Sequence, residues 1–177
     1  MLVVAEPEKL PVQEARAGSP AAWDLLFKRY QLPLYVYVFE LVHNEQSSLD
    51  IVQESFINAV RHLGSLRNDS KFGSWLFGIA HQKCIQRWRK QNREEAFLEE
   101  ITAEASFDAD GDSSPLDLLI RVEEEAEFMK VLNRLPLPQR SVLLLHFIEE
   151  FSLEEIATIT GAQLGTVKSR LHYAKKA

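Results

Sequence analysis

Apolar residues recur every three or four positions along most of the chain, which is the pattern of helices that bury one face. The clearest case is residues 49–63, which end before Gly64, and either Ser47 or Ser48 is placed to cap the start of this helix. Its apolar stripe consists of Leu49, Val52, Phe56, Ala59, Val60 and Leu63. Its other side carries Asp50, Gln53, Glu54 and Asn58. The pattern predicts a helix with a buried face and a polar ridge.

The segments before this helix differ in how clearly they predict structure. Residues 1–18 have weak periodicity and several helix breakers, so we expect a flexible tail. Ser19 followed by Pro20 is a typical helix start, with a capping hydroxyl before a proline at the first helical position. Residues 34–42 are rich in β-branched and aromatic side chains, which suits a strand by propensity, but their helical neighbours favour a second helix. Residues 19–94 therefore predict a compact four-helix unit.

Residues 71–93 change character halfway along a single predicted helix. The first half is aromatic and apolar, whereas the second half is basic, and the whole segment lacks Asp and Glu. Lys83, Arg87 and Lys90 fall at i, i+4 and i+7, which places them on one side of a helix. Such a basic stripe suits a polyanion, but it is equally typical of a solvated helix end whose cations favour the helix dipole. Both interpretations stay open on this segment alone.

The C-terminal third contains the most specific local pattern. Residues 95–115 are acidic and offer little to bury, so they predict a linker, and helix resumes from residue 116. Ser152 and Glu155 have the spacing of a capping box. The residues that follow, Ile156, Ala157, Gly161 and Val167, have the spacing of a helix-turn-helix, although any helical hairpin is an alternative. The last helix would present a set of DNA-reading side chains.

Composition limits the classes of function. The net charge is -6, but thirteen acids lie between Glu94 and Glu127 against one base, so the acidic total hides the basic segments. Cys84 is the only cysteine, which excludes an internal disulfide and a cysteine-cluster zinc site and suits a reducing cytoplasm. The sequence has no apolar run of about 18 residues, and its histidines are scattered without an acid and a nucleophile at recognisable spacing. We therefore expect a cytoplasmic protein without catalytic residues, metal or cofactor.

Four segments in consistent order resemble the bacterial sigma-70 family, in particular its two-domain extracytoplasmic function subgroup. They are residues 49–56 (LDIVQESF), 72–80 (FGSWLFGIA), 135–140 (LPLPQR) with 155–157 (EIA), and 165–171 (GTVKSRL). The resemblance covers residues 21–177. It departs from the family pattern at His81-Gln82, where family members commonly have Arg-Asn, and at Tyr173, where a basic residue is common.

The resemblance implies an all-α fold of two small helical domains joined by an acidic linker. The expected limits are a tail over 1–18, a region 2 helical bundle over 19–94, a linker over 95–115 and a region 4 helix-turn-helix over 116–177. It implies that core RNA polymerase is bound through Asp50, Gln53 and Glu54. The minus-ten element is then contacted by Arg61, Asn68, Asp69, Lys83, Arg87 and Lys90, with loop 61–70 capturing a base turned out of the stack. The minus-35 element is contacted by Thr166, Lys168, Ser169, Arg170, His172 and Tyr173.

The implied function is a dissociable transcription initiation factor that binds core polymerase, recognises both promoter elements and helps to open the DNA. The polymerase carries out the chemistry, so the chain itself is not an enzyme. Its expected partners are core RNA polymerase, promoter DNA and an anti-sigma factor. Two alternatives remain at this point: a regulator that uses only the helix-turn-helix, and a sigma-like decoy that captures a sigma-binding partner without reading promoters.

Overall fold

A computed structural model describes residues 9–99 and 123–176, and all regular structure within these two ranges is helical. The N-terminal part contains α1 (Val12–Arg16), α2 (Pro20–Val42), α3 (Glu45–His62) and α4 (Phe72–Glu99), with 3-10 turns η1 (Leu63–Ser65) and η2 (Asp69–Lys71) between the last two. The C-terminal part contains α6 (Glu123–Arg134), α7 (Leu137–Ile148), α8 (Leu153–Thr160) and α9 (Leu164–Lys176). The predicted all-α fold is confirmed.

Local signals set several helix ends as the sequence predicts. The Ser19 hydroxyl accepts a hydrogen bond from the backbone N–H of Ala22 at 3.3 Å, and Pro20 opens α2. At α8 both bonds of the capping box are present, one from the Glu155 backbone N–H to the Ser152 hydroxyl and one from the Ser152 N–H to the Glu155 carboxylate. Gly161 ends α8 with a φ of 67°, a left-handed conformation that glycine adopts without steric cost.

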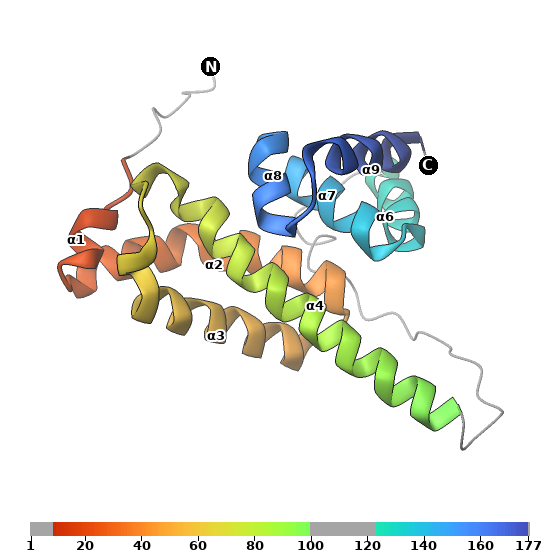
Figure 1. The fold of residues 1–177 in the computed structure, drawn as a ribbon, viewed down its shortest axis with the longest axis horizontal. Helices are drawn as coiled ribbons and strands as arrows, with labels where there is room; N and C mark the ends of the chain where they lie inside the picture. Colours follow the sequence, from red (N-terminus) through yellow and green to blue (C-terminus); the bar gives the residue numbers. More distant parts are fainter. Residues whose placement is uncertain (1–8, 100–122, 177) are drawn as a thin grey trace.

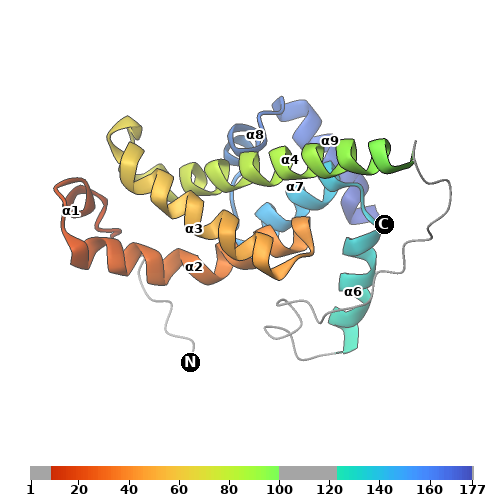
Figure 2. The same cartoon turned by 90° about the horizontal axis from the view of Figure 1, so that it is seen from below.

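The prediction of two separate helices before residue 42 is wrong, because α2 continues through Pro33 as one helix. Residues 36–41 of this helix are all buried, and they pack between the N-terminal bundle and α7 of the C-terminal part (Figure 2). Apart from Glu40, which is also buried, this segment is apolar or aromatic on all sides, so its sequence lacks the one-sided helical pattern. The helix continues although Pro33 removes one of its backbone hydrogen bonds.

The start and the buried face of α3 also differ from the prediction. Asn44, rather than Ser47 or Ser48, caps the helix, and its side-chain oxygen accepts from the Ser47 backbone N–H at 2.8 Å. Leu49 is 48% exposed and Val60 is 56% exposed, so neither belongs to the core. Ala59 of the predicted stripe is 0% exposed, and so are Ser48 and Ser55, which the stripe did not include. Both buried serine hydroxyls donate to carbonyls of the preceding turn, which makes their burial acceptable.

Both ends of the N-terminal unit extend further than expected. Residues 12–16 form α1, within the predicted tail, and Val12 and Ala15 are buried against α2. Trp23 donates its indole N–H to the Ala15 carbonyl at 3.1 Å, which fixes α1 on the bundle. At the other end α4 runs to Glu99, past the expected domain limit at residue 94. The rest of the predicted linker, residues 100–115, lies outside the described residues, as do residues 1–8 and 116–122.

The N-terminal and C-terminal parts pack directly against each other (Figure 1). The main contacts join α4 to α8 and α2 to α7. Phe77 of α4 and Phe151, which precedes α8, are both buried, and their rings meet edge to face with centroids 5.2 Å apart. An ideal Cβ built on Gly78 would lie 3.9 Å from the Cα of Ile159, so the two helix backbones approach closely at this point. One continuous apolar core therefore joins the two parts.

Candidate nucleic-acid and polymerase interfaces

The polar ridge of α3 lies on the surface, as its sequence predicts. Asp50, Gln53 and Glu54 are all exposed on one side of the helix. Asp50 accepts a hydrogen bond from the Gln46 amide at 3.1 Å, one turn earlier. Glu54 forms an ion pair with Lys83 of α4 at 3.2 Å. The residues expected to bind polymerase therefore adjoin those expected to bind DNA, which the sequence did not indicate.

The stripe on α4 begins in the core and ends on the surface. Phe72 and Leu76 are fully buried, whereas Arg87 and Lys90 are exposed. Beside these two cations lies a cavity of about 370 Å³, which is also lined by residues at the junction of α2 and α3. The lining residues are Val42, His43, Asn44, Arg87, Lys90 and Gln91. The geometry leaves these cations able to contact a polyanion.

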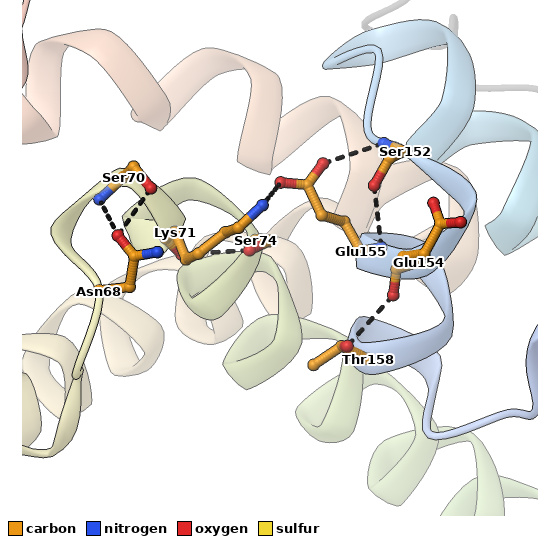
Figure 3. Close-up of polar contacts among 8 residues, drawn as sticks. All are labelled: Asn68, Ser70, Lys71, Ser74, Ser152, Glu154, Glu155 and Thr158. Atoms are coloured by element: carbon orange, nitrogen blue, oxygen red, sulfur yellow. Dashed lines mark hydrogen bonds and ion pairs between the residues drawn. The ribbon is translucent and has the colours of Figure 1, made fainter.

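The loop before α4 is more tightly bonded than its sequence suggests. Asn68 caps η2, and its side-chain oxygen accepts from both the backbone N–H and the hydroxyl of Ser70, at 3.1 and 2.7 Å (Figure 3). Asp69 accepts from the Arg16 guanidinium at 2.7 Å, and that bond is the main reason why its pKa lies below the usual range. Arg61, at the end of α3, is exposed. Arg16 lies within the predicted tail, so it was not among the residues expected at this loop.

Most of the side chains expected to read the minus-35 element project outward from α9. Val167 and Leu171 anchor the helix in the core. The exposed members of the set are Thr166, Lys168, Ser169, His172 and Tyr173. Arg170 is only partly exposed. Its charge is the smaller of two causes that lower the pKa of His81 in α4, the larger being burial.

His81, the departure from the family pattern, is a core residue in this structure. Its Nδ1 lies 2.7 Å from the Tyr37 hydroxyl, and the side chain is buried. Burial, with a smaller contribution from the charge of Arg170, lowers the pKa of His81 to about 4. The imidazole is therefore neutral at pH 7. Gln82, the next residue, is exposed.

Polar contacts between the two parts of the chain form a third group that sequence reasoning missed. Arg29 of α2 binds Glu149 through two parallel bonds of 3.0 and 2.9 Å. Lys71, at the start of α4, binds the Glu155 carboxylate at 2.9 Å (Figure 3). Each pair joins residues far apart in the sequence, so no helical periodicity could have indicated it.

Arg140 of α7 makes polar contacts to both parts of the chain. Its guanidinium donates to the backbone carbonyl of Glu40 at 3.2 Å and lies 3.0 Å from His43 Nε2. It also donates to three carbonyls around the end of α6, those of Leu132, Asn133 and Leu135. Burial is the main cause that lowers the pKa of His43, and the Arg140 charge adds to it. A single side chain thus ties the end of α2 to the turn between α6 and α7.

Neither a metal site nor a membrane span is found in the described part of the chain. Among residues 9–99 and 123–176, no three His, Cys, Asp or Glu side chains come together as a metal site would require. Over the same residues, none of the helices has the length and apolar character that crossing a membrane needs.

Comparisons with known proteins agree with this arrangement. The sequence model of Sigma-70 region 2 matches residues 26–94, and that of Sigma-70, region 4 matches residues 125–177. The RNA polymerase sigma-H factor of Pseudomonas aeruginosa is 32% identical over 99% of this chain and 94% of its own length. The ECF RNA polymerase sigma-E factor of Escherichia coli strain K12 is 32% identical over 96% of this chain and 91% of its own.

A solved structure gives the same result for the fold. The sigma factor RpoE of Bartonella quintana, in complex with the anti-sigma factor NepR, matches with a TM-score of 0.64 and 26% identity. The match covers 86% of this chain and 92% of that one. With two family regions in the expected order and relatives aligned along nearly their whole length, this chain belongs to the extracytoplasmic function subgroup of the sigma-70 family.

Proposed function

We propose that this sigma factor binds core RNA polymerase through α3, contacts the minus-ten element through α4 and its preceding loop, and contacts the minus-35 element through α9. The polymerase carries out the chemistry. One observation carries the proposal: the polar ridge of α3, the basic end of α4 and the outer face of α9 are all exposed, and each of the three helices is anchored in the core. The chain thus presents three exposed polar surfaces, the first two adjoining at the Glu54–Lys83 pair, as suits a factor with one protein partner and two DNA elements.

The roles of individual residues follow from these surfaces. Asp50, Gln53 and Glu54 form the polymerase-binding ridge. Lys83, Arg87 and Lys90 neutralise promoter phosphates, and the Glu54–Lys83 pair opens when each residue meets its own partner. Because Glu54 is 62% exposed, breaking that pair costs little beside the new bonds to polymerase and DNA. Arg61, Asn68 and Asp69 act in the loop at the site of melting. On α9 the minus-35 contacts come from Thr166, Lys168, Ser169, Arg170, His172 and Tyr173.

Contact between α4 and α8 has a geometric consequence for this function. Elements named for positions 10 and 35 are separated by about 25 base pairs, which is about 85 Å of duplex at 3.4 Å per base pair. Two packed helices have axes only about 10 Å apart. The two parts of the chain must therefore separate before both elements can be bound. A fully extended segment of the length of residues 100–122 reaches about 80 Å, which is of the required order.

The same function sets the expected partners and location. Core polymerase and promoter DNA lie in the cytoplasm of bacteria, and we place this chain there as well. We also propose that an anti-sigma factor controls it, since the matched RpoE structure is a complex with such a factor.

A transcription assay tests the proposal. The purified chain is added to bacterial core polymerase with a library of promoter fragments, and specific run-off transcripts are measured. Specific transcripts support the proposed function. Retarded DNA in the absence of polymerase, without transcripts, would instead identify a regulator that uses only the helix-turn-helix. If neither transcripts nor retarded DNA are observed, the decoy interpretation remains.

A further inference from the structure

Helix α1 is bonded to the loop that precedes α4. One nitrogen of the Arg16 guanidinium, Nη2, donates to the backbone carbonyl of Leu66 at 3.1 Å and to the Asp69 carboxylate at 2.7 Å. These two acceptors lie on either side of residues 67 and 68, which are exposed. A single side chain therefore fixes both ends of a short surface segment.

The support behind Arg16 is rigid. Val12 is 0% exposed and Ala15 is 3% exposed, so the short helix is held by its apolar face. Trp23 donates to the Ala15 carbonyl, and its ring meets that of Phe72, the first residue of α4, with centroids 6.3 Å apart. The same aromatic side chain thus contacts α1 and the helix that the loop leads into. A guanidinium carried on this support can hold the loop in one position, because its planar group presents several N–H donors in a fixed geometry.

Space for a ligand lies next to the braced loop. A cavity of about 400 Å³ opens between α1 and the loop. Its lining residues are Lys9, Leu10, Pro11, Gln13, Glu14, Asp69 and Ser70. Amide, hydroxyl and carboxylate groups can hydrogen-bond to the edge of an unpaired base, and Lys9 supplies a cation for its phosphate.

We propose that Arg16 is a positioning residue for promoter opening: it braces the loop over residues 66–69 so that an unpaired nucleotide can enter the cavity beside α1. The inference deepens the proposed function and rests on it. It adds to the melting site a helix that lies before residue 26, where the match to Sigma-70 region 2 begins. Because Arg16 already orders the loop, less conformational entropy is lost when the loop captures a base.

The test compares Arg16→Ala with wild type in the full holoenzyme, on a duplex promoter and on the same promoter with a mismatched, pre-opened bubble. Lys28→Ala is the matched control, because Lys28 is another surface cation in an ion pair, with Asp24 of the same helix. Open complex on the duplex is measured by permanganate reactivity of unpaired thymines, and the bubble, which is unpaired from the start, is assayed by its yield of run-off transcript. On the duplex, Arg16→Ala should reduce opening about five- to tenfold, the effect of a lost charge-assisted bond. On the bubble its deficit should shrink to less than about twofold, and Lys28→Ala should match wild type on both templates.

The two templates also separate positioning from loss of fold. A variant that simply folds poorly loses activity equally on the duplex and on the bubble, and this result would overturn the proposal. Wild-type opening of the duplex by Arg16→Ala would overturn it as well. Arg16→Lys, which keeps one cationic donor, should recover most of the opening, and failure to recover would count against a role for this bond. If wild type neither opens the duplex nor gives a transcript from the bubble, the proposed function itself fails, whatever Arg16 does.

Discussion

The contact between the two parts of the chain allows a quantitative prediction. Glu149→Gln with Glu155→Gln removes the acidic partner of two ion pairs that join the parts, Arg29–Glu149 and Lys71–Glu155. Glutamine at 155 keeps the capping box of α8, because its side-chain oxygen can still accept from the Ser152 N–H. The double variant therefore weakens the contact between the parts without removing a helix cap.

The exposure of each pair sets the expected size of the effect. Lys71 is 50% exposed and Glu155 is 22% exposed, so their pair contributes at most about 1 kcal/mol. Glu149 is 8% exposed and is held by two parallel bonds from Arg29, which places that pair near the upper end for surface ion pairs. Together the two losses amount to about 1–2 kcal/mol, which shifts the ratio of open to closed chains about 5- to 30-fold.

Distances between spin labels on the two parts report this shift. Labels on cysteines introduced at Val60 and Gln163, both exposed, should give one narrow distribution of distances in wild type and an added population of longer distances in the double variant. Native Cys84 is buried and should react poorly with the label. Salt should lengthen the wild-type distances, because ions screen exposed pairs. Asp24→Asn, which removes an acid from a pair within α2, is the control and should leave the distances unchanged.

A second perturbation addresses the apolar part of the same contact. Gly78→Ala adds a Cβ at an ordinary contact distance of 3.9 Å from the Cα of Ile159, so the closed state should persist. Gly78→Leu places further carbons against the α8 backbone, which cannot move away as a flexible side chain can, and it should open the chain. Unchanged label distances in both Gly78→Leu and the double glutamine variant would refute the direct contact between α4 and α8.

Three further predictions concern two surfaces and one buried side chain. Replacing Lys83, Arg87 and Lys90 with Gln should weaken promoter binding by the holoenzyme. The slope of log binding constant against log salt concentration should fall in magnitude by about three, roughly one per phosphate contact. An unchanged slope would mean that these cations belong to a solvated helix end and do not contact DNA. Asp50→Ala with Gln53→Ala should leave the thermal midpoint unchanged but weaken core polymerase binding by about 1–3 kcal/mol per lost contact, and unchanged affinity would exclude this ridge as the docking surface. Stability should fall as the pH drops from 6.5 towards about 4, because the unfolded chain protonates His81 before the folded chain does. A His81→Gln variant should lose much of that dependence in urea titrations at each pH, and an undiminished dependence would contradict a buried neutral His81.

Local chemistry explains why much of the fold could be predicted from the sequence. Ser19 with Pro20, and Ser152 with Glu155, act within a few residues of the chain, so their spacing specifies the helix start without knowledge of the neighbours. Gly161 is similar, since its left-handed conformation follows from the turn itself. These are the positions at which prediction and structure agree.

Predictions failed where packing across the chain overrides local pattern. The continuous α2 is covered by α7, and the buried face of α3 includes Ser48 and Ser55, two polar residues that an apolar count does not register. The Arg29–Glu149 and Lys71–Glu155 pairs join residues 120 and 84 positions apart. The sequence shows only that such charges exist. Their pairing follows from how the two parts pack.

Run-off transcription with core polymerase tests the central claim most directly. Wild type should direct specific transcripts from a subset of promoter fragments, and Asp50→Ala with Gln53→Ala should need a higher concentration to reach the same yield. Replacement of Lys168, which is exposed on α9, should change the upstream sequences that are selected. No specific transcript at any concentration of the wild-type chain, with the polymerase active on a control sigma factor, would contradict the account.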